Sequence, residues 1–473
     1  SRLMPVPAPL RPIRRRTVVF GLLLALGGMV LSGRAGWAQS ADAVRPASVR
    51  ADLDTLLRTF EAVHPDLYRN VSREDIRRRR AVIEQQLTGP VSPRTVAVAM
   101  ARLAAAFDDG HTRVDLPLGA YEAAARSGAR TFPLTVSTTN GRVYVRRSCD
   151  SALPPRARLL SINGRDAAVL FQTVQAVVSG AEPYRQAVAE DQFPWLLWLH
   201  EVEAPFRIAY VSPSTGAPQT RTLRGADFAT VQRCLSPDPQ PAYTFSRRAR
   251  TALLTIHRLA HPARFRQFLG TVADSLEQQP PDGLVIDLRD CPGGRTRVAR
   301  LLLSAFTDEP LRLVARKDWK VSTAYKQHLR TRLPGHPYLD RPVGRVVSIR
   351  YDAKPLPSVP LRYRGPLTVL VGPRTFSSAV TLAATLKANQ LATVVGSETG
   401  GRVHRFGEGY TFRLPHTGLH AMVSSAYFAH ASRPRDWSGG VPPHVPVQPP
   451  VGVGSDITLG VALARMRHLD AVP

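Results

Sequence analysis

Three short segments hold the residue types that acyl-transfer chemistry needs. The segment V-G-P-R-T-F-S-S-A (371–379) follows an apolar strand pattern and puts Ser377 where a helix should begin. F-D-D-G-H-T (107–112) contains His111, and V-I-D-L-R-D-C-P-G-G (285–294) runs from an apolar strand into a glycine turn. A serine hydroxyl needs a neighbouring base to become nucleophilic, and histidine titrates near neutral pH. Ser377 activated by His111 is one interpretation; an N-cap serine and a helix-capping histidine are the alternatives.

In order and in spacing, these segments resemble the tail-specific (C-terminal processing) and tricorn-core serine peptidases. That family shows a D-G-H-T segment, a strand reading D-L-R-x-N-x-G-G, and T-x-S-S-A ahead of a helix. The likeness continues through V-V-G-S-E-T-G-G, F-G-E-G-Y-T-F-R-L-P-H-T-G-L and D-W-S-G-G-V-P-P-H-V, and it is strongest over 283–447. The resemblance implies a serine peptidase that hydrolyses polypeptides and needs no cofactor.

The resemblance also bears on the base that activates the serine. Classical members place a lysine 25 positions after the serine, and this chain has Arg402 there. A guanidinium stays protonated at physiological pH and cannot act as the base. The tricorn-like branch is implied instead, in which His111 activates Ser377 and Asp436 orients the histidine. Three other carboxylates compete for the orienting role: Asp108, Asp109 and Glu398.

By the same resemblance, the amides of Gly293 and Ser378 would hold the oxyanion. A glycine lets the backbone approach a substrate closely, and two N–H donors stabilise the developing charge. The chain departs from the family pattern at Val380, where most relatives have glutamate, and at Asp290 and Cys291, which replace the usual residues between arginine and proline. These departures leave open a second hypothesis, a catalytically inactive member that binds an apolar ligand or a peptide.

The histidines near the C-terminal end do not favour a metal site. His416 and His420 are four residues apart, a ligand spacing that suits a helix, but Pro415 and Gly418 mark a strand and turn. The sequence contains no C-x-x-C pair. We therefore expect no metal.

Three kinds of secondary-structure pattern along the chain must position these segments. Apolar residues at helical spacing over 46–107 predict a helical cap. Alternation over 132–145, broken by Asn140 and Gly141, predicts a hairpin, and the segment 157–166 resembles the strand and turn of a PDZ-like module. Later, short apolar strands alternate with helices, which predicts an α/β layer on a largely parallel sheet. The expected strands are 251–256, 284–288, 367–371 and 393–395, and the expected helices are 263–276, 297–305 and 378–388.

A chain of 473 residues exceeds what one hydrophobic core usually organises. We expect a multidomain α/β protein with a signal peptide (1–38), a helical cap domain (39–115), a β-rich PDZ-like domain (116–230) and an α/β core domain (231–473). The resemblance implies a core of the ClpP/crotonase-like type.

The first 38 residues have the order of a secretory signal peptide. Three arginines (14–16) precede an apolar run (18–31), and small residues lead to Ala38, after which we expect cleavage. The mature protein would be periplasmic or extracellular, without a stable membrane span; an uncleaved anchor is the alternative. Cys149 and Cys234 suit a disulfide under oxidising conditions, and three cysteines leave at least one unpaired.

The formal charge of +27 invites a nucleic-acid hypothesis. The excess is mostly arginine, spread over every region, with no basic helix and no zinc-finger spacing to focus it. We interpret it as a solvated surface and expect a polypeptide partner, not nucleic acid.

Overall fold

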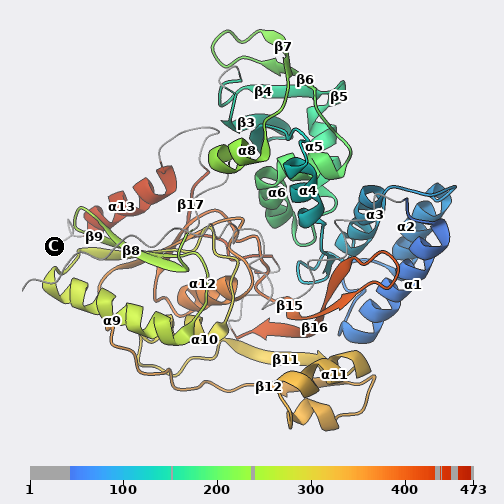
Figure 1. Ribbon diagram of the computed structural model, residues 1–473. Helices are drawn as coiled ribbons and strands as arrows, with labels where there is room; N and C mark the ends of the chain where they lie inside the picture. Colours follow the sequence, from blue (N-terminus) through green and yellow to red (C-terminus); the bar gives the residue numbers. More distant parts are fainter. Residues whose placement is uncertain are drawn as a thin grey trace, which may run out of the picture.

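The computed structural model describes residues 43–150, 153–235, 240–431, 437, 439–448 and 456–469. Over these residues three β-sheets are surrounded by helices (Figure 1), so the predicted multidomain α/β fold is confirmed. The predicted signal peptide and Asp436 lie outside the described residues. Among the helices of the described ranges, none combines the length and the apolar character that a membrane crossing requires.

The first sheet is the predicted parallel layer. Its order is β17-β14-β13-β10-β9-β8, parallel from β17 to β9, with β8 antiparallel at the edge. Its strands are β8 (Tyr243–Arg248), β9 (Thr251–Ile256), β10 (Gly283–Asp287), β13 (Leu367–Val371), β14 (Thr393–Gly396) and β17 (Val445–Pro446). Its helices are α9 (Pro262–Gln278), α10 (Thr296–Leu303), α12 (Ser378–Ala388) and α13 (Ile457–Leu469).

Apolar burial on both faces explains why these segments form this layer. Every residue of β13 is buried, as expected of a strand covered by helices on both sides. Side chains of α9, α10 and α12 form one core with the sheet, and α13 covers the opposite face. The predicted elements agree with the observed ones to within two residues at every end.

A second sheet is antiparallel, with the order β2-β3-β4-β6-β7 and β5 paired to β4. Asn140 and Gly141 form the predicted turn between β2 and β3, and both have positive φ, as a tight hairpin requires. A disulfide joins Cys149 to Cys234 and ties the end of β3 to α8. The strands are β2 (Leu134–Thr139), β3 (Arg142–Ser148), β4 (Arg158–Ile162), β5 (Arg165–Asp166), β6 (Phe206–Val211) and β7 (Pro218–Leu223). The helices are α4 (Leu118–Arg126), α5 (Ala167–Gln175), α6 (Glu182–Asp191), α7 (Phe193–Leu199) and α8 (Phe228–Leu235).

The third sheet brings together segments that are far apart in the sequence. Its strands are β1 (Arg113–Val114), β11 (Val314–Lys320), β12 (Val346–Arg350), β15 (Arg405–Arg413) and β16 (His420–His430), with α11 (Thr323–Arg332) and the 3-10 helix η1 (Pro337–Asp340) between β11 and β12. The short strand β1 pairs with the long strand β16. The segment with His111 therefore docks on the C-terminal hairpin β15–β16.

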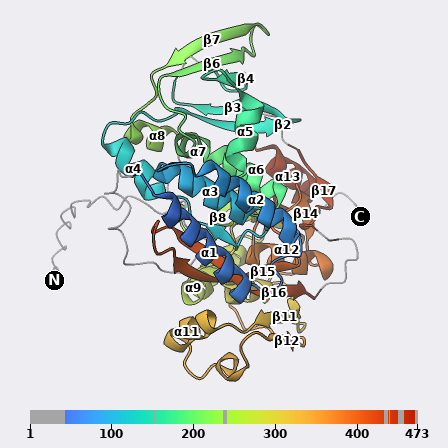
Figure 2. The ribbon, with the colours of Figure 1, turned by 90° about the vertical axis from the view of Figure 1, so that its right-hand side faces the viewer.

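The predicted helical cap covers this hairpin (Figure 2). It consists of α1 (Pro46–Val63), α2 (Arg73–Gln86) and α3 (Pro93–Ala105). The hydroxyls of Ser72 and Ser92 accept hydrogen bonds from first-turn amides and cap α2 and α3. The ring of Phe60 in α1 packs edge-on against Phe412 in β15, with centroids 6.1 Å apart. The cap and the C-terminal hairpin thus share one core.

Candidate active site

Ser377 occupies a sharp turn between β13 and α12. Its backbone has φ 54° and ψ −122°, a combination that costs free energy for a residue with a Cβ. The hydroxyl makes no cap hydrogen bond to α12, which argues against the N-cap interpretation. A serine on such a strained strand-to-helix turn presents its oxygen above the sheet, as in the nucleophile elbows of α/β-hydrolases.

The turn is held by the segment after the neighbouring strand β10. The Phe376 amide donates to the Cys291 carbonyl at 3.0 Å, and the Thr375 hydroxyl donates to the Leu288 carbonyl at 2.7 Å. The carboxyl ends of parallel strands meet at one edge of a sheet, where ligands bind in open α/β folds. The second and third predicted segments therefore meet at one edge.

Gly293 lies against the serine turn. A Cβ added to Gly293 would be 2.7 Å from the Phe376 carbonyl oxygen and 2.8 Å from the Ser378 nitrogen. Its φ of 95° also favours glycine. The neighbouring Cys291 thiol is buried, and burial raises its pKa to about 12. The two predicted oxyanion donors, Gly293 and Ser378, are thus brought together.

His111 reaches Ser377 from the turn between α3 and β1. Its Nε2 lies 3.3 Å from the Ser377 Oγ, although the two residues are 266 positions apart. The Phe376 ring stacks on the imidazole at a centroid distance of 5.0 Å. Gly110 makes room for this contact, because a Cβ there would be 2.6 Å from the Phe376 ring. The separation lets the imidazole accept the hydroxyl proton.

Asp109 is the described carboxylate next to the imidazole. One oxygen, Oδ1, accepts the His111 amide at 3.0 Å and lies 3.9 Å from His111 Nδ1. The other oxygen accepts the hydroxyls of Thr112 and Ser424, both at 2.6 Å. Burial alone would raise the Asp109 pKa, but His64, His111 and Ser424 together hold it well below its usual value. Asp109 is therefore ionised.

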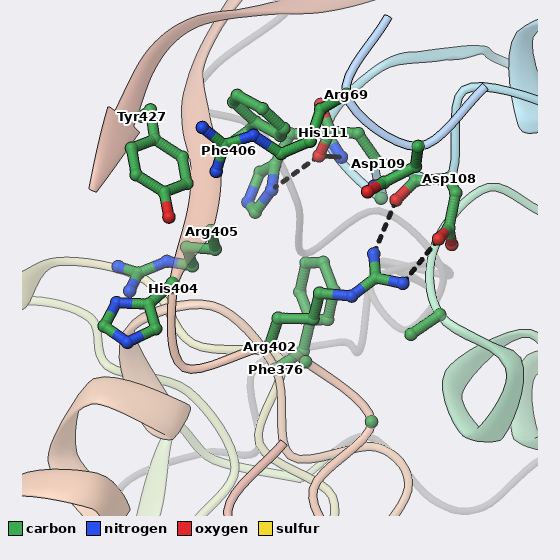
Figure 3. Close-up of a pocket in the computed structure, with 15 residues that line it drawn as sticks. Arg69, Asp108, Asp109, His111, Phe376, Arg402, His404, Arg405, Phe406 and Tyr427 are labelled. Atoms are coloured by element: carbon green, nitrogen blue, oxygen red, sulfur yellow. Dashed lines mark hydrogen bonds and ion pairs between the residues drawn. The ribbon is translucent and has the colours of Figure 1, made fainter. Parts of the chain in front are cut away.

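The other predicted carboxylates are engaged elsewhere. Arg402, at the position of the classical lysine, forms an ion pair with Asp108 and donates to its carbonyl oxygen at 2.7 Å (Figure 3). Glu398 accepts the Gly440 amide at 2.6 Å. Asp436 lies outside the described residues. Arg402 thus holds the turn before His111 and takes no lysine-like place beside the serine.

Burial controls the proton affinity of His111. Desolvation lowers its pKa to about 4, assisted by the charges of Arg405 and Arg113 and opposed by Asp109. At neutral pH the imidazole is uncharged, so a ring nitrogen is free to accept a proton.

A pocket of about 250 Å³ opens beside His111 (Figure 3). Its wall combines rings with charged groups from the cap and from β15. Its lining residues include Arg69, Asp108, Asp109, Arg402, His404 and Arg405.

Two residues that contact Asp109 were not predicted from the sequence. His64 follows α1, and its Nε2 lies 3.5 Å from Asp109 Oδ2. Ser424 comes from the middle of β16. Neither belongs to a catalytic motif, and both approach Asp109 only through tertiary packing, so no sequence signal singled them out.

The departures from the family pattern have structural explanations. Val380 is fully buried, and its Cγ2 would lie 2.8 Å from a Cβ at Gly401. Asp290 accepts a hydrogen bond from Arg374 at 3.3 Å, and Arg374 also pairs with Asp191 of α6. These residues build the surroundings of the serine turn. Over the described ranges, no group of three or more histidine, cysteine or acidic side chains is arranged to hold a metal ion.

Comparisons with known proteins support this description. Residues 250–447 match the family model described as peptidase family S41. A search of curated protein sequences found no match. Mature CPAF superposes with a TM-score of 0.60 at 16% identity, covering 85% of this chain and 93% of that chain. Mature CPAF complexed with lactacystin gives a TM-score of 0.61 at 14% identity, covering 89% and 98%. At these identities the structures show a common fold.

Residues 250–447 thus form a domain of peptidase family S41. This match supports the predicted serine-type peptidase activity. The predicted family is confirmed; the tricorn-like branch and the role of each residue stay predictions.

Proposed function

We propose that the protein is a secreted peptidase that cleaves polypeptides through an acyl-enzyme, with Ser377 as nucleophile and His111 as base. The observation that carries the proposal is the 3.3 Å separation of His111 Nε2 and Ser377 Oγ. The strained backbone of Ser377 supports it, because strain of this kind collects at functional sites.

The reaction follows from this pair. Ser377 Oγ attacks the peptide carbonyl carbon while His111 Nε2 takes its proton, and the amides of Gly293 and Ser378 bind the oxyanion. The imidazolium then returns the proton to the leaving amine. A water molecule repeats the sequence at the acyl group and regenerates the Ser377 hydroxyl.

The third residue has two candidates. Asp436 is the residue that the family resemblance implies, and Asp109 is the described carboxylate 3.9 Å from His111 Nδ1. We propose that Asp109 supplies the negative charge that stabilises the imidazolium. Asp109→Asn should lower kcat about a thousandfold or more, as for other triad carboxylates. A loss of that size in Asp436→Asn, with little change in Asp109→Asn, would assign the role to Asp436.

Secretion is also part of the proposal. The Cys149–Cys234 disulfide favours an oxidising compartment, as does the predicted leader with cleavage after Ala38. Fractionation of cells that make the full chain, with N-terminal sequencing of the product, tests this. A full-length protein retained in the cytoplasm would contradict it.

The catalytic pair is tested with an active-site phosphonate probe on the purified mature protein. The wild type and the control Ser348→Ala, an exposed position on β12, should be labelled. Ser377→Ala should not react, and His111→Ala should react much more slowly. Labelling that survives Ser377→Ala would reject Ser377 as the nucleophile.

A second candidate function is the inactive binding protein. It is favoured by a pocket of about 410 Å³ among β11, α11 and η1, lined by Trp319, Tyr325, Tyr338 and Leu329. This function would be favoured if the wild type bound an apolar fluorescent ligand tightly and showed neither labelling by the phosphonate probe nor turnover of unfolded protein.

A further inference from the structure

Two arginines of the pocket beside His111 already have carboxylate partners. Arg402 pairs with Asp108. The Arg69 Nε donates to Asp66 Oδ2 at 2.9 Å, and its guanidinium lies over the Tyr427 ring at 4.2 Å. Their charges are therefore largely balanced within the protein.

Arg405 differs from both. It begins β15, and its Nη1 donates to the Thr381 hydroxyl of α12 at 2.6 Å. Within the described part of the chain it forms no salt bridge. Burial lowers its pKa to about 10, with Glu408 opposing the shift. The pocket wall thus holds a charged guanidinium that is partly removed from water and forms no salt bridge within the described residues, since the nearby Glu408 carboxylate pairs with Lys317.

The pocket carboxylates cannot serve as that partner. Asp108 is bound by Arg402, and both oxygens of Asp109 accept hydrogen bonds from residues 111, 112 and 424. His404, beside Arg405 in Figure 3, accepts the His430 amide on Nδ1, and burial lowers its pKa. The wall therefore has a net positive charge at Arg405.

We propose that this pocket is a specificity pocket of the peptidase, in which Arg405 binds a carboxylate of the polypeptide substrate. The inference rests on the catalytic pair proposed above, because His111 makes this pocket a subsite. A guanidinium fork matches a carboxylate in geometry, and pairing offsets the cost of leaving a buried charge alone. The carboxylate is either an aspartate or glutamate side chain or the C-terminus of the peptide.

Substrate binding would also act on the base. The Arg405 charge is one cause of the lowered His111 pKa. A carboxylate bound to Arg405 offsets that charge and makes His111 a stronger base within the complex. In a pH profile of kcat, the acid limb should therefore lie at higher pH for acidic substrates than for neutral ones. The reason is that kcat reports the pKa values of groups in the enzyme–substrate complex.

Measuring peptide binding to the Ser377→Ala variant, which should not cleave its substrate, tests the proposal without catalysis. Short peptides with blocked ends carry either glutamate or glutamine at one position, and a third peptide is neutral with a free C-terminus. Calorimetry should show a preference of about tenfold to a hundredfold for one carboxylate-bearing peptide over the glutamine peptide. Whichever peptide gains affinity identifies the source of the carboxylate.

Variants in the same background assign the preference to Arg405. Arg405→Met should abolish it, and Arg405→Lys should retain part of it. Thr381→Val removes the hydrogen bond to Arg405 and keeps the charge, so it should keep the preference. Arg413→Met, on the exposed end of the same strand, is the matched control.

No carboxylate preference, or one that Arg405→Met leaves intact, would overturn the proposal. Turnover by the wild type without such a preference would reject this inference and leave the proposed function standing. An Arg405-dependent preference in a wild type that fails to turn over peptides would reject the catalytic proposal alone.

Discussion

The two sides of the proposed catalytic pair are positioned by different forces. The Ser377 turn is held by backbone hydrogen bonds and by glycines that leave no room for a Cβ. The His111 turn is held by charged groups: the buried Asp109 accepts the His111 amide, and Arg402 pairs with Asp108 at the start of the turn. Backbone packing is insensitive to pH, whereas buried charges respond to it. The nucleophile should therefore be fixed over a wide pH range, and the base should set the pH response.

The largest effect should come from breaking the pair itself. Ser377→Ala and His111→Ala should each lower kcat about 10⁴-fold or more, and the double variant should be no slower than either, because residues that act as one unit are not additive. Steady-state assays on an unfolded protein substrate measure this. Independent losses that multiply would show that the two sides do not act together.

A lysine at position 402 sharpens the comparison further. Arg402→Lys restores the residue type of the classical dyad but should not rescue His111→Ala, because Arg402 reaches Asp108 and not the serine. Turnover in the His111→Ala background should stay down about 10⁴-fold. Recovery of most of the activity would mean that the lysine replaces histidine as the base.

Close packing on the serine side predicts a smaller loss. Gly293→Ala would press a Cβ against the Phe376 carbonyl and the Ser378 amide, and kcat should fall about a hundredfold to a thousandfold through the oxyanion contacts. Gly128→Ala is the matched control, since Gly128 has a similar φ of 101° and no atom near its Cβ position. Equal losses in the two variants would point to backbone strain as the cause.

The pH response is the smallest effect. The lowered His111 pKa means that the neutral, reactive form persists below the ordinary histidine value of 6.5 and is lost as pH falls toward about 4. The acid limb of kcat/KM should lie in that window for a neutral peptide. Arg405→Met should move it upward, because one charge that opposes protonation is removed. A limb near 6.5 in the wild type would contradict the buried environment.

The sequence predicted the parallel layer well because its elements are local. Each strand is a short apolar run bounded by turns. The helix 262–278 has an apolar face, and the helix 378–388 is buried over almost its whole length. Motif spacing identified Ser377 and His111, and the fold brings them together. The contacts of Asp109 with His64 and Ser424 depend on how α1 and β16 pack, which no local pattern specifies.

Contacts in the structure cross the expected domain boundaries. The sequence suggested a cap that ends at 115, but the cap shares its core with β15 and β16 near the other end of the chain. Pairing between such distant segments leaves no signal in periodicity. The expected PDZ-like domain corresponds to an antiparallel sheet, and its relation to PDZ modules stays a prediction.

The link between the first helix and the last hairpin has a consequence for the order of synthesis. The buried carboxylate of Asp52 in α1 accepts the amides of His416 and Thr417 in the β15–β16 turn, 364 and 365 positions later. His111 docks on β16 through β1. A nascent chain exposes its N-terminal helices long before their partners exist. His111 can meet Ser377 in its final setting only after β16 has been synthesised, so the proposed catalytic pair would be incomplete in a shorter nascent chain.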